Sequence, residues 1–401
     1  LADTTSSGPV RFTDIINTFE VGPTLSLTFP KLVPMGKRLQ RKLSKRLYPS
    51  TTYKSSVTIQ QRPEFLRVRG NFLYNWNFKQ GKTQAWEVSL IDLNFVSLGQ
   101  DSAFQETLED LNDPFLLNSY SDHLTTAIAA NWHFNNLNSN RRKINLAEGK
   151  RKKGKHIHDI NVNVMTSGAG LFAIKVGENN PNDFGQWTIN GVPYSTFLRF
   201  DVQYVINQYV NENTSLAYRA LIGAGDPYGN SPSMPYEYAF SAGGSNDIRA
   251  FQAKTMAPGS TQKYIDPDLP LTQIGDMRAE VNVEYRFKMA GALEGALFAD
   301  VGNIWLISKE NVDGAFRWAS FYKELAIGGG FGLRFDLDFL VVRLDAAVPI
   351  HNPYLPETER WITKQHKPIY LSQIDAVYDP GIWEWTNPHR INITFGIGYP
   401  F

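Results

Sequence analysis

The sequence predicts an all-β protein, namely a transmembrane antiparallel β-barrel with long external loops. Two observations support this prediction: long segments in which apolar and polar residues alternate, and short turns that alternate with long loops. No apolar run approaches the roughly 18 residues that a membrane helix needs, but this does not exclude a membrane protein. A membrane-spanning strand needs only about 9–11 residues. About thirteen segments of this kind follow one another between residues 19 and 401.

Alternation is clearest in two segments near the end of the chain. In 276–289 the odd-numbered residues are apolar and the even-numbered residues are polar or charged, and in 391–401 the odd-numbered residues from Ile391 to Phe401 are again apolar. The alternative is a soluble β-sandwich, whose strands usually have only about 5–6 residues. The length of the segments and the charge on their polar faces favour a barrel with lipid outside and water inside.

Composition excludes several other classes of protein. The chain has 40 Lys and Arg against 39 Asp and Glu, a net charge of +1, which argues against a nucleic-acid-binding protein. It has no cysteine, so disulfides and thiolate metal sites are excluded. His156 and His158 lie on one face of a predicted strand, but no third ligand is evident, so we expect no metal site. No cofactor is expected either.

Residues 1–18 are polar and irregular, and we expect a linker or the remnant of an upstream region there; residues 19–401 form the predicted barrel domain. Two basic stretches, 37–46 and 141–155, interrupt the strands, and strand parity places both on the side of the short turns. A solvated charged loop and a contact with a periplasmic partner both remain open for them. The predicted strands are 19–29, 51–61, 65–78, 84–97, 121–136, 156–172, 194–210, 215–226, 273–288, 291–305, 323–337, 339–350 and 391–400.

The long loop at 227–272 contains a glycine-led motif. Gly243 and Gly244 permit a positive φ and hence a sharp turn. Arg249 lies between the apolar residues Ile248 and Phe251, which suggests a loop that packs into the protein with its guanidinium directed at carboxylates. An ordinary surface turn is the alternative for the nonapeptide taken alone.

The motif resembles the Gly-Gly-x-x-x-Val-Arg-Gly-Phe/Tyr signature of the bacterial outer-membrane assembly barrels, the BamA/TamA (surface-antigen) superfamily. The chain looks most similar to the TamA-like branch of Bacteroidota. The resemblance implies that the loop folds into the lumen and that Arg249 pairs with carboxylates of the barrel wall, for which Glu284 and Asp300 stand at the matching places. Ala250 departs from the family's glycine, and a positive φ at that position would strain an alanine.

The family has sixteen strands, eleven before the signature loop and five after it. The sequence supplies the five but only eight before the loop, so we expect that three strands and the periplasmic POTRA domains precede Leu1, where no signal peptide is seen. The alternative is that hairpins within 98–120, 173–193 or 351–388 belong to the barrel.

The resemblance implies a non-enzymatic protein of the bacterial outer membrane that assembles, inserts or translocates proteins. Its first and last strands would part to form a lateral gate, with Gly396, Gly398, Tyr399 and Phe401 in the C-terminal strand. The expected partners are outer-membrane lipid, client outer-membrane proteins and periplasmic or lipoprotein accessory subunits, with no nucleic acid. The alternatives are a protein secretion pore or passive channel, and a barrel hydrolase.

Overall fold

The structure is a computed structural model that describes ten parts of the chain. These are residues 19–61, 65–100, 120–137, 156–174, 185–211, 213–261, 273–307, 312–337, 340–362 and 391–401. The predictions for 1–18, for 141–155 and for most of the hairpin regions 98–120 and 351–388 fall outside the described residues. None of the described helices is long and apolar enough to cross a membrane.

The described residues form sixteen strand segments and three short helical segments. The strands are β1 (Phe19–Val21), β2 (Thr24–Phe29), β3 (Ser50–Gln61), β4 (Phe65–Gln80), β5 (Gln84–Gln100), β6 (His123–Asn135), β7 (His156–Ser167), β8 (Thr188–Ile189), β9 (Val192–Ser195), β10 (Phe197–Tyr209), β11 (Thr214–Pro227), β12 (Met277–Ala290), β13 (Leu293–Trp305), β14 (Ala326–Asp336), β15 (Val341–His351) and β16 (Asn392–Ile397). The helices are α2 (Lys37–Leu47), α6 (Ala169–Ala173) and the 3₁₀ turn η1 (Phe321–Lys323).

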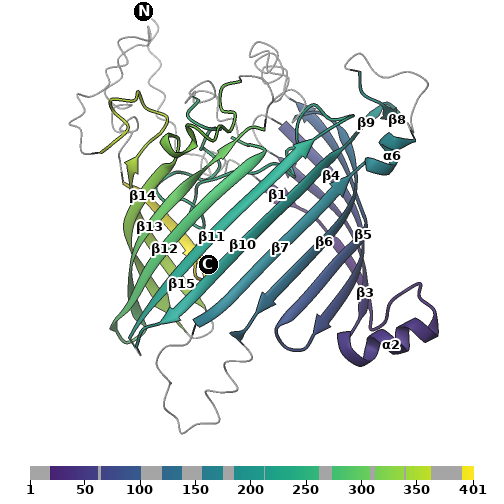
Figure 1. Ribbon diagram of the computed structural model, residues 1–401, viewed down its shortest axis with the longest axis horizontal. Helices are drawn as coiled ribbons and strands as arrows, with labels where there is room; N and C mark the ends of the chain where they lie inside the picture. Colours follow the sequence, from purple (N-terminus) through teal and green to yellow (C-terminus); the bar gives the residue numbers. More distant parts are fainter. Residues whose placement is uncertain are drawn as a thin grey trace, which may run out of the picture.

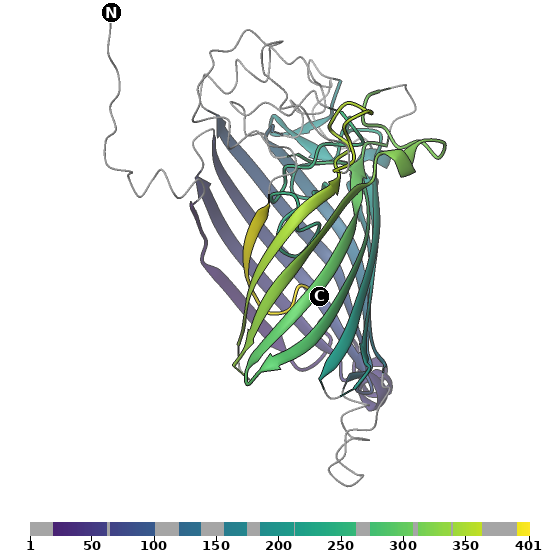
Figure 2. The same ribbon diagram turned by 90° about the vertical axis from the view of Figure 1, so that its left-hand side faces the viewer.

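The long strands form one antiparallel sheet in chain order, which curves strongly around a central space (Figures 1 and 2). Thirteen strands lie along the main path from β1 to β16, the number that the sequence predicts; β2 also pairs with β3, and β8 and β9 form a small hairpin against β6. The all-β antiparallel prediction is confirmed. In the part of the chain that the structure describes, β1/β2 and β16 are the two edges of the sheet.

β1 and β2 are two parts of one broken strand. Both pair with β3 on the same side, β1 with its last residues and β2 with its first half. The break is at Gly22–Pro23, where a Cβ on Gly22 would lie 2.7 Å from the carbonyl oxygen of Val57. Proline cannot donate to a ladder, and the close approach admits only glycine before it.

The two faces of the sheet differ as the alternation predicts. In β12 the side chains of Glu280, Asn282 and Glu284 are buried on the concave face, whereas Val281 and Tyr285 are exposed on the convex face. The convex face is apolar on the other strands as well; in β16, Ile393 and Phe395 are 67% and 64% exposed. An exposed apolar belt around a polar interior is the pattern of a membrane barrel.

The connections divide the sheet into two ends (Figure 1). The short-turn end carries the tight β4–β5 and β12–β13 turns and the helix α2, while the long-loop end carries the β11–β12 loop. The basic stretch 37–46 therefore lies at the predicted end, folded as a helix. The hairpin considered within 173–193 is present in part as β8–β9, which is far too short to span a membrane.

The C-terminal end of the chain departs from the predicted strand 391–400. Alternation places Tyr399 and Phe401 on the outer face, but β16 ends at Ile397 and Gly398 has φ +83°, so the chain turns inward there. Tyr399 and Phe401 lie on the concave side beside Arg286, and both views place the C-terminus inside the curved sheet (Figures 1 and 2). Alternation holds only while the backbone stays extended.

Replacing Leu297 with Arg tests the lipid-facing belt. Leu297 is 53% exposed on the convex face of β13, and an arginine near the middle of such a belt costs about 2–4 kcal/mol, against about 0–1 near its rim. Met289, 52% exposed at the end of β12, provides the matched control. Urea titration of the vesicle-embedded protein should therefore show a larger loss of stability for Leu297→Arg than for Met289→Arg. Equal losses would contradict the assignment.

Candidate functional site: the loop between β11 and β12

The loop after β11 forms a compact turn at its tip. Gly243 and Gly244 have φ +93° and +97°, and the Gly244 amide donates to the carbonyl of Phe251 at 2.9 Å. A Cβ on Gly243 would lie 2.3 Å from the carbonyl oxygen of Gln252. Both glycines are thus needed, one for its close approach and both for their backbone conformation.

Arg249 projects from this turn onto the concave face of β12 and β13. Its Nε and Nη2 donate to the two oxygens of Asp300, each at 2.9 Å, and its Nη1 donates to Glu284 at 2.5 Å. Its backbone amide also donates to Asp300, at 3.0 Å, and its guanidinium carbon lies 3.5 Å from the centre of the Phe298 ring. All three charged side chains are fully buried. Burial disfavours the charged guanidinium, but the two carboxylates outweigh it and raise the pKa of Arg249 above its usual value.

Glu284 is shared with two further arginines. Arg286 donates to one of its oxygens at 2.8 Å, and Arg334 of β14 donates to the other at 3.2 Å. Arg334 also pairs with Asp345 of β15, so the network continues across four adjacent strands. Buried charges of this kind are tolerated only when each has partners, which this arrangement supplies.

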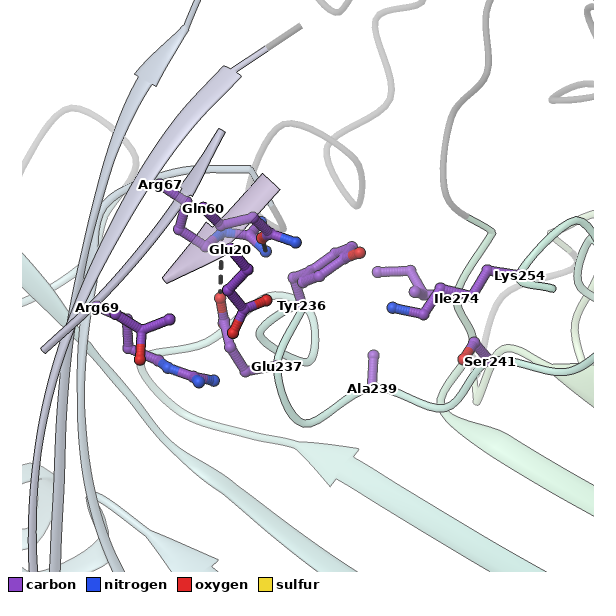
Figure 3. Close-up of a pocket in the computed structure, with 11 residues that line it drawn as sticks. Glu20, Gln60, Arg67, Arg69, Tyr236, Glu237, Ala239, Ser241, Lys254 and Ile274 are labelled. Atoms are coloured by element: carbon purple, nitrogen blue, oxygen red, sulfur yellow. Dashed lines mark hydrogen bonds and ion pairs between the residues drawn. The ribbon is translucent and has the colours of Figure 1, made fainter. Parts of the chain in front are cut away.

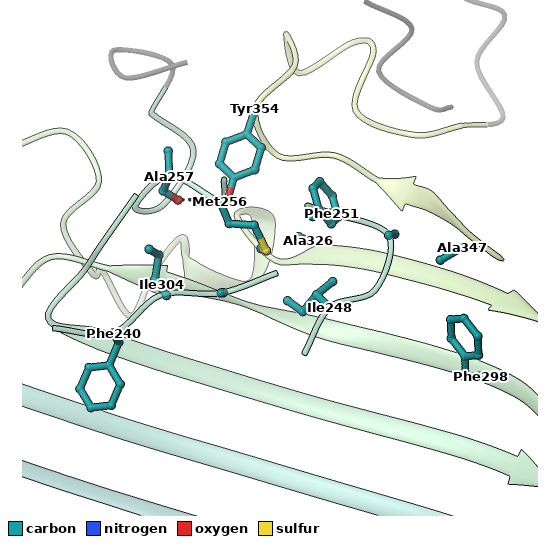
Figure 4. Packing of buried hydrophobic residues seen from close by; sticks show 12 residues of the cluster. Phe240, Ile248, Phe251, Met256, Ala257, Phe298, Ile304, Ala326, Ala347 and Tyr354 are labelled. Atoms are coloured by element: carbon teal, nitrogen blue, oxygen red, sulfur yellow. Dashed lines mark hydrogen bonds between the residues drawn. The ribbon is translucent and has the colours of Figure 1, made fainter. Parts of the chain in front are cut away.

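An apolar cluster contains the loop neighbours of Arg249, and Figure 4 shows its side chains. Ile248 is fully buried, and Phe251 packs edge-on against Tyr354 with ring centres 6.3 Å apart. Met256 from the loop and Ala326 from β14 belong to the same cluster. These side chains keep water from the Arg249 contacts and so strengthen them.

Ala250 occupies an ordinary backbone conformation, because it is not among the residues with positive φ. The expected strain at this position is therefore absent. The space for its methyl group comes from the facing strand: a Cβ on Gly328 of β14 would lie 2.4 Å from the Cβ of Ala250. The alanine at the tip and the glycine in the wall are complementary in shape.

The last strands also contact the loop. Arg343 of β15 donates to the carbonyl of Ser245 at 2.8 Å, and the Asn392 amide of β16 donates to the carbonyl of Arg249 at 2.8 Å. A Cβ on Gly396 would lie 2.3 Å from Nε of Arg343, so that glycine makes room for the arginine. The tip of the loop is thus hydrogen-bonded directly to the last two strands.

The C-terminal residues join the same network through Arg286. Its guanidinium lies 4.4 Å from the centre of the Tyr399 ring and donates to the carbonyl of Phe401 at 3.3 Å. The Tyr399 hydroxyl donates to Glu294 of β13 at 3.0 Å. Of the residues predicted for the C-terminal strand, Gly396 alone lies within β16, and the other three form the inward turn.

A second contact holds the loop against the opposite wall (Figure 3). The Glu237 carboxylate lies 3.0 Å from Nε2 of His123 in β6 and 3.4 Å from Nε of Arg67 in β4. Next to it, Asn94 of β5 donates to the Tyr238 hydroxyl at 2.6 Å. Burial alone would raise the pKa of Glu237, but the hydrogen bond and charge of His123, with the charge of Arg67, hold it below its usual value.

The structure brings together all the residues that the sequence singled out around Arg249. Sequence reasoning missed Arg334, Asp345, Asn392 and the Glu237 contact. The polar alternation could have placed Arg334 and Asp345 on the concave face, but which of the inward charges meet depends on strand register. His158 donates to or accepts from Tyr204 at 2.8 Å, and among the described residues no group of three His, Asp or Glu is placed to hold a metal.

This fold and site define a class: an outer-membrane-type β-barrel with a charged concave face and a loop bonded to it. The chain belongs to the Omp85 superfamily, since the Omp85 superfamily domain matches residues 182–398, more than half of it. It is therefore a protein of the outer membrane, as predicted, in the superfamily of the assembly and transport barrels.

Individual relatives are distant. The chain is 28% identical over 89 residues to outer membrane protein assembly factor BamA of Neisseria meningitidis serogroup B, a match that covers 21% of the chain and 11% of that protein. The fold is similar to the crystal structure of BamA from Haemophilus ducreyi lacking POTRA domains 1–3, with a TM-score of 0.54, 13% identity, and coverage of 83% of this chain and 59% of that one. CdiB from Escherichia coli matches at a TM-score of 0.44, with 12% identity over 75% of this chain and 46% of that one. The chain thus spans only part of the length of these relatives.

A double-mutant cycle tests the complementarity of Ala250 and Gly328. Gly328→Ala introduces an overlap of two methyl groups, and overpacking of this kind costs about 1–3 kcal/mol. Adding Ala250→Gly removes the overlap, so the double variant should regain most of the stability, as measured by the temperature of unfolding on semi-native gels. Gly70→Ala in β4, where a Cβ meets nothing within 4 Å, is the control. Additive losses in the double variant would disprove the contact.

Proposed function

We propose that this protein inserts or assembles other proteins in the outer membrane, through a barrel whose lumen holds the β11–β12 loop. The observation that carries the proposal is the fully buried pairing of Arg249 with Glu284 and Asp300. A loop that simply covered the mouth of a barrel would need no buried guanidinium with two carboxylate partners. In this proposal the latch residues Gly243, Gly244, Ile248, Arg249 and Phe251 hold the loop against the wall, with Glu284 and Asp300 as their partners.

The contacts with both walls favour assembly over passive diffusion. Arg249 bonds to β12 and β13, while Glu237, about a dozen residues earlier in the loop, bonds to β4 and β6. A loop fixed at both sides obstructs the path along the barrel axis, so an open channel is disfavoured. No catalytic chemistry is proposed, and neither a cofactor nor nucleic acid belongs to the mechanism.

The last strand would provide the gate. β16 is an edge of the described sheet and pairs with β15 over six residues only. The chain turns away from the ladder after Gly398, whose amide still donates to the carbonyl of Val341. An exposed strand edge can pair with a further strand by β-augmentation, which is how a client outer-membrane protein would engage it. Because Asn392 bonds to the loop at Arg249, opening of this edge and release of the loop would be linked. Periplasmic or lipoprotein subunits would deliver the clients.

A protein secretion pore is the second candidate. A cavity of about 320 Å³ lies between the loop and the β3–β4 wall, lined by Arg67, Arg69 and Lys254 among others (Figure 3). This polar space leaves one side of the lumen incompletely filled, and release of the loop would widen it into a passage.

Reconstitution distinguishes the two candidates. Vesicles that contain the wild-type protein should speed the folding of an added urea-unfolded client barrel, scored by its heat-resistant form, and should conduct little current. Arg249→Ala combined with Glu237→Gln should slow client folding severalfold and raise conductance, because the ion pairs that hold the loop against each wall are lost. Arg317→Ala, in an exposed external segment, is the control.

Two results of this experiment would contradict the assembly proposal, each at a different step. A wild-type protein that leaves client folding at the rate of empty vesicles, with a doubly substituted variant that conducts, would favour the pore and overturn the assembly proposal. A variant that folds clients at the wild-type rate would instead overturn the role of the loop contacts.

A further inference from the structure

The helix α2, between β2 and β3, lies on the outside of the barrel wall at the short-turn end (Figure 1). The segment leading into it is bonded to the convex face. The Thr51 hydroxyl donates to the carbonyl of Lys31 at 2.8 Å and accepts from the amide of Val33 at 2.9 Å. The indole nitrogen of Trp76 and the hydroxyl of Tyr74 both donate to the carbonyl of Val33.

These wall residues share the lipid-facing side of their strands. Tyr74 and Trp76 alternate along β4 with inward residues such as Asn75, and they share their face with Phe72, which is 39% exposed. The Tyr53 and Tyr74 rings stack with centres 4.9 Å apart. The segment that carries α2 is therefore fastened to an aromatic patch at the rim of the apolar belt, where aromatic girdles meet the membrane surface.

The helix is strongly basic. Its eleven residues, Lys37-Arg-Leu-Gln-Arg-Lys-Leu-Ser-Lys-Arg-Leu47, include six Lys or Arg and no Asp or Glu. Arg38, Arg41 and Lys42 are exposed, and no carboxylate in the described part of the chain pairs with them. Leu43 and Leu47 lie on the opposite face and are half-buried. Six like charges in one short helix repel one another unless counter-charges lie nearby.

We propose that α2 lies along the membrane surface at the short-turn end and binds the phosphate groups of anionic phospholipids. A basic amphipathic helix at the rim of an apolar surface has the composition of an interfacial helix, with cations among the headgroups and apolar residues toward the hydrocarbon. Each Lys or Arg near an anionic surface strengthens binding. Lipid is the occupant because the segment leading into the helix is fastened to the lipid-facing wall, on which Leu25 and Leu27 of β2 are 77% and 56% exposed.

Energy transfer to labelled lipids tests this proposal on the intact protein. The chain has no cysteine, so Gly36→Cys, where a Cβ meets nothing within 4 Å, provides one site for a donor dye at the start of α2. The protein is placed in phosphatidylcholine nanodiscs with traces of acceptor lipid. The acceptor is carried on the acyl chain of either phosphatidylglycerol or phosphatidylcholine, so only the headgroup differs.

We expect greater transfer to phosphatidylglycerol than to phosphatidylcholine at low salt, and a smaller difference in 1 M NaCl, where charges are screened. Arg41→Gln should lower the preference by about fivefold at most, the factor for one charge near an anionic surface, and Arg38→Gln/Arg41→Gln should lower it further. Glutamine preserves helix propensity, and heat-modifiable migration on gels verifies that each variant is folded.

The control variant Arg317→Gln/Lys323→Gln also removes two positive charges, but from exposed residues at the long-loop end. It should leave the lipid preference unchanged. Equal transfer to both lipids from the unaltered helix would overturn the proposal. The proposal would also be overturned if the α2 variants and the control variant reduced the lipid preference equally. The same holds if the α2 variants kept the lipid preference but lost binding to a periplasmic protein.

Discussion

The ion pairs of Arg249 are the interaction on which the arrangement of the loop depends. A guanidinium withdrawn from water is strongly unfavourable unless carboxylates replace the lost hydration, and removing one partner of such a buried pair costs about 3–5 kcal/mol. Here the carboxylates come from two neighbouring strands and approach from two sides. The register of β12 and β13 is therefore a condition for the position of the loop, since a slip of one residue would turn Glu284 or Asp300 toward lipid.

Glu284 makes this interaction part of a larger unit. It bonds to arginines from the loop, from its own strand and from β14, and one of these arginines, Arg286, also holds the C-terminal turn. A loop that left its place would leave Glu284 with a changed set of partners and would break the Asn392 contact with the last strand. The loop and the edge of the sheet thus share one hydrogen-bonded network that includes the buried charges, which is a physical basis for coupled movement.

Much of the fold could be predicted from the sequence because β-strands have a period of two, which assigns each residue of a long strand to a face. This period correctly placed Glu284 and Asp300 inside and Val281 outside. It failed for Tyr399 and Phe401 because the positive φ of Gly398 ends the extended conformation. It also could not predict which inward charges meet, as for Arg334 with Asp345, since that depends on register.

The site was predictable only where a motif marked it. Arg249 and its two carboxylates were found through their resemblance to a family signature, whereas the contact of Glu237 with His123 and Arg67 joins positions too far apart for any local pattern to reveal. The space for Ala250 depends on Gly328, in a strand almost eighty residues later. The charge of the basic stretch 37–46 is evident from the sequence, but its place on the outer wall depends on hydrogen bonds between residues distant in sequence, which no local pattern predicts.

Hydrogen exchange of the loop amides measures the central interaction most directly. The amide of Arg249 donates to Asp300, and those of Gly244 and Phe251 close the turn. If the buried ion pairs hold the loop, Arg249→Ala should speed the exchange of residues 244–251 by about a hundredfold or more and leave amides of β3–β6 unchanged. Unchanged protection of these loop amides in Arg249→Ala would contradict the account.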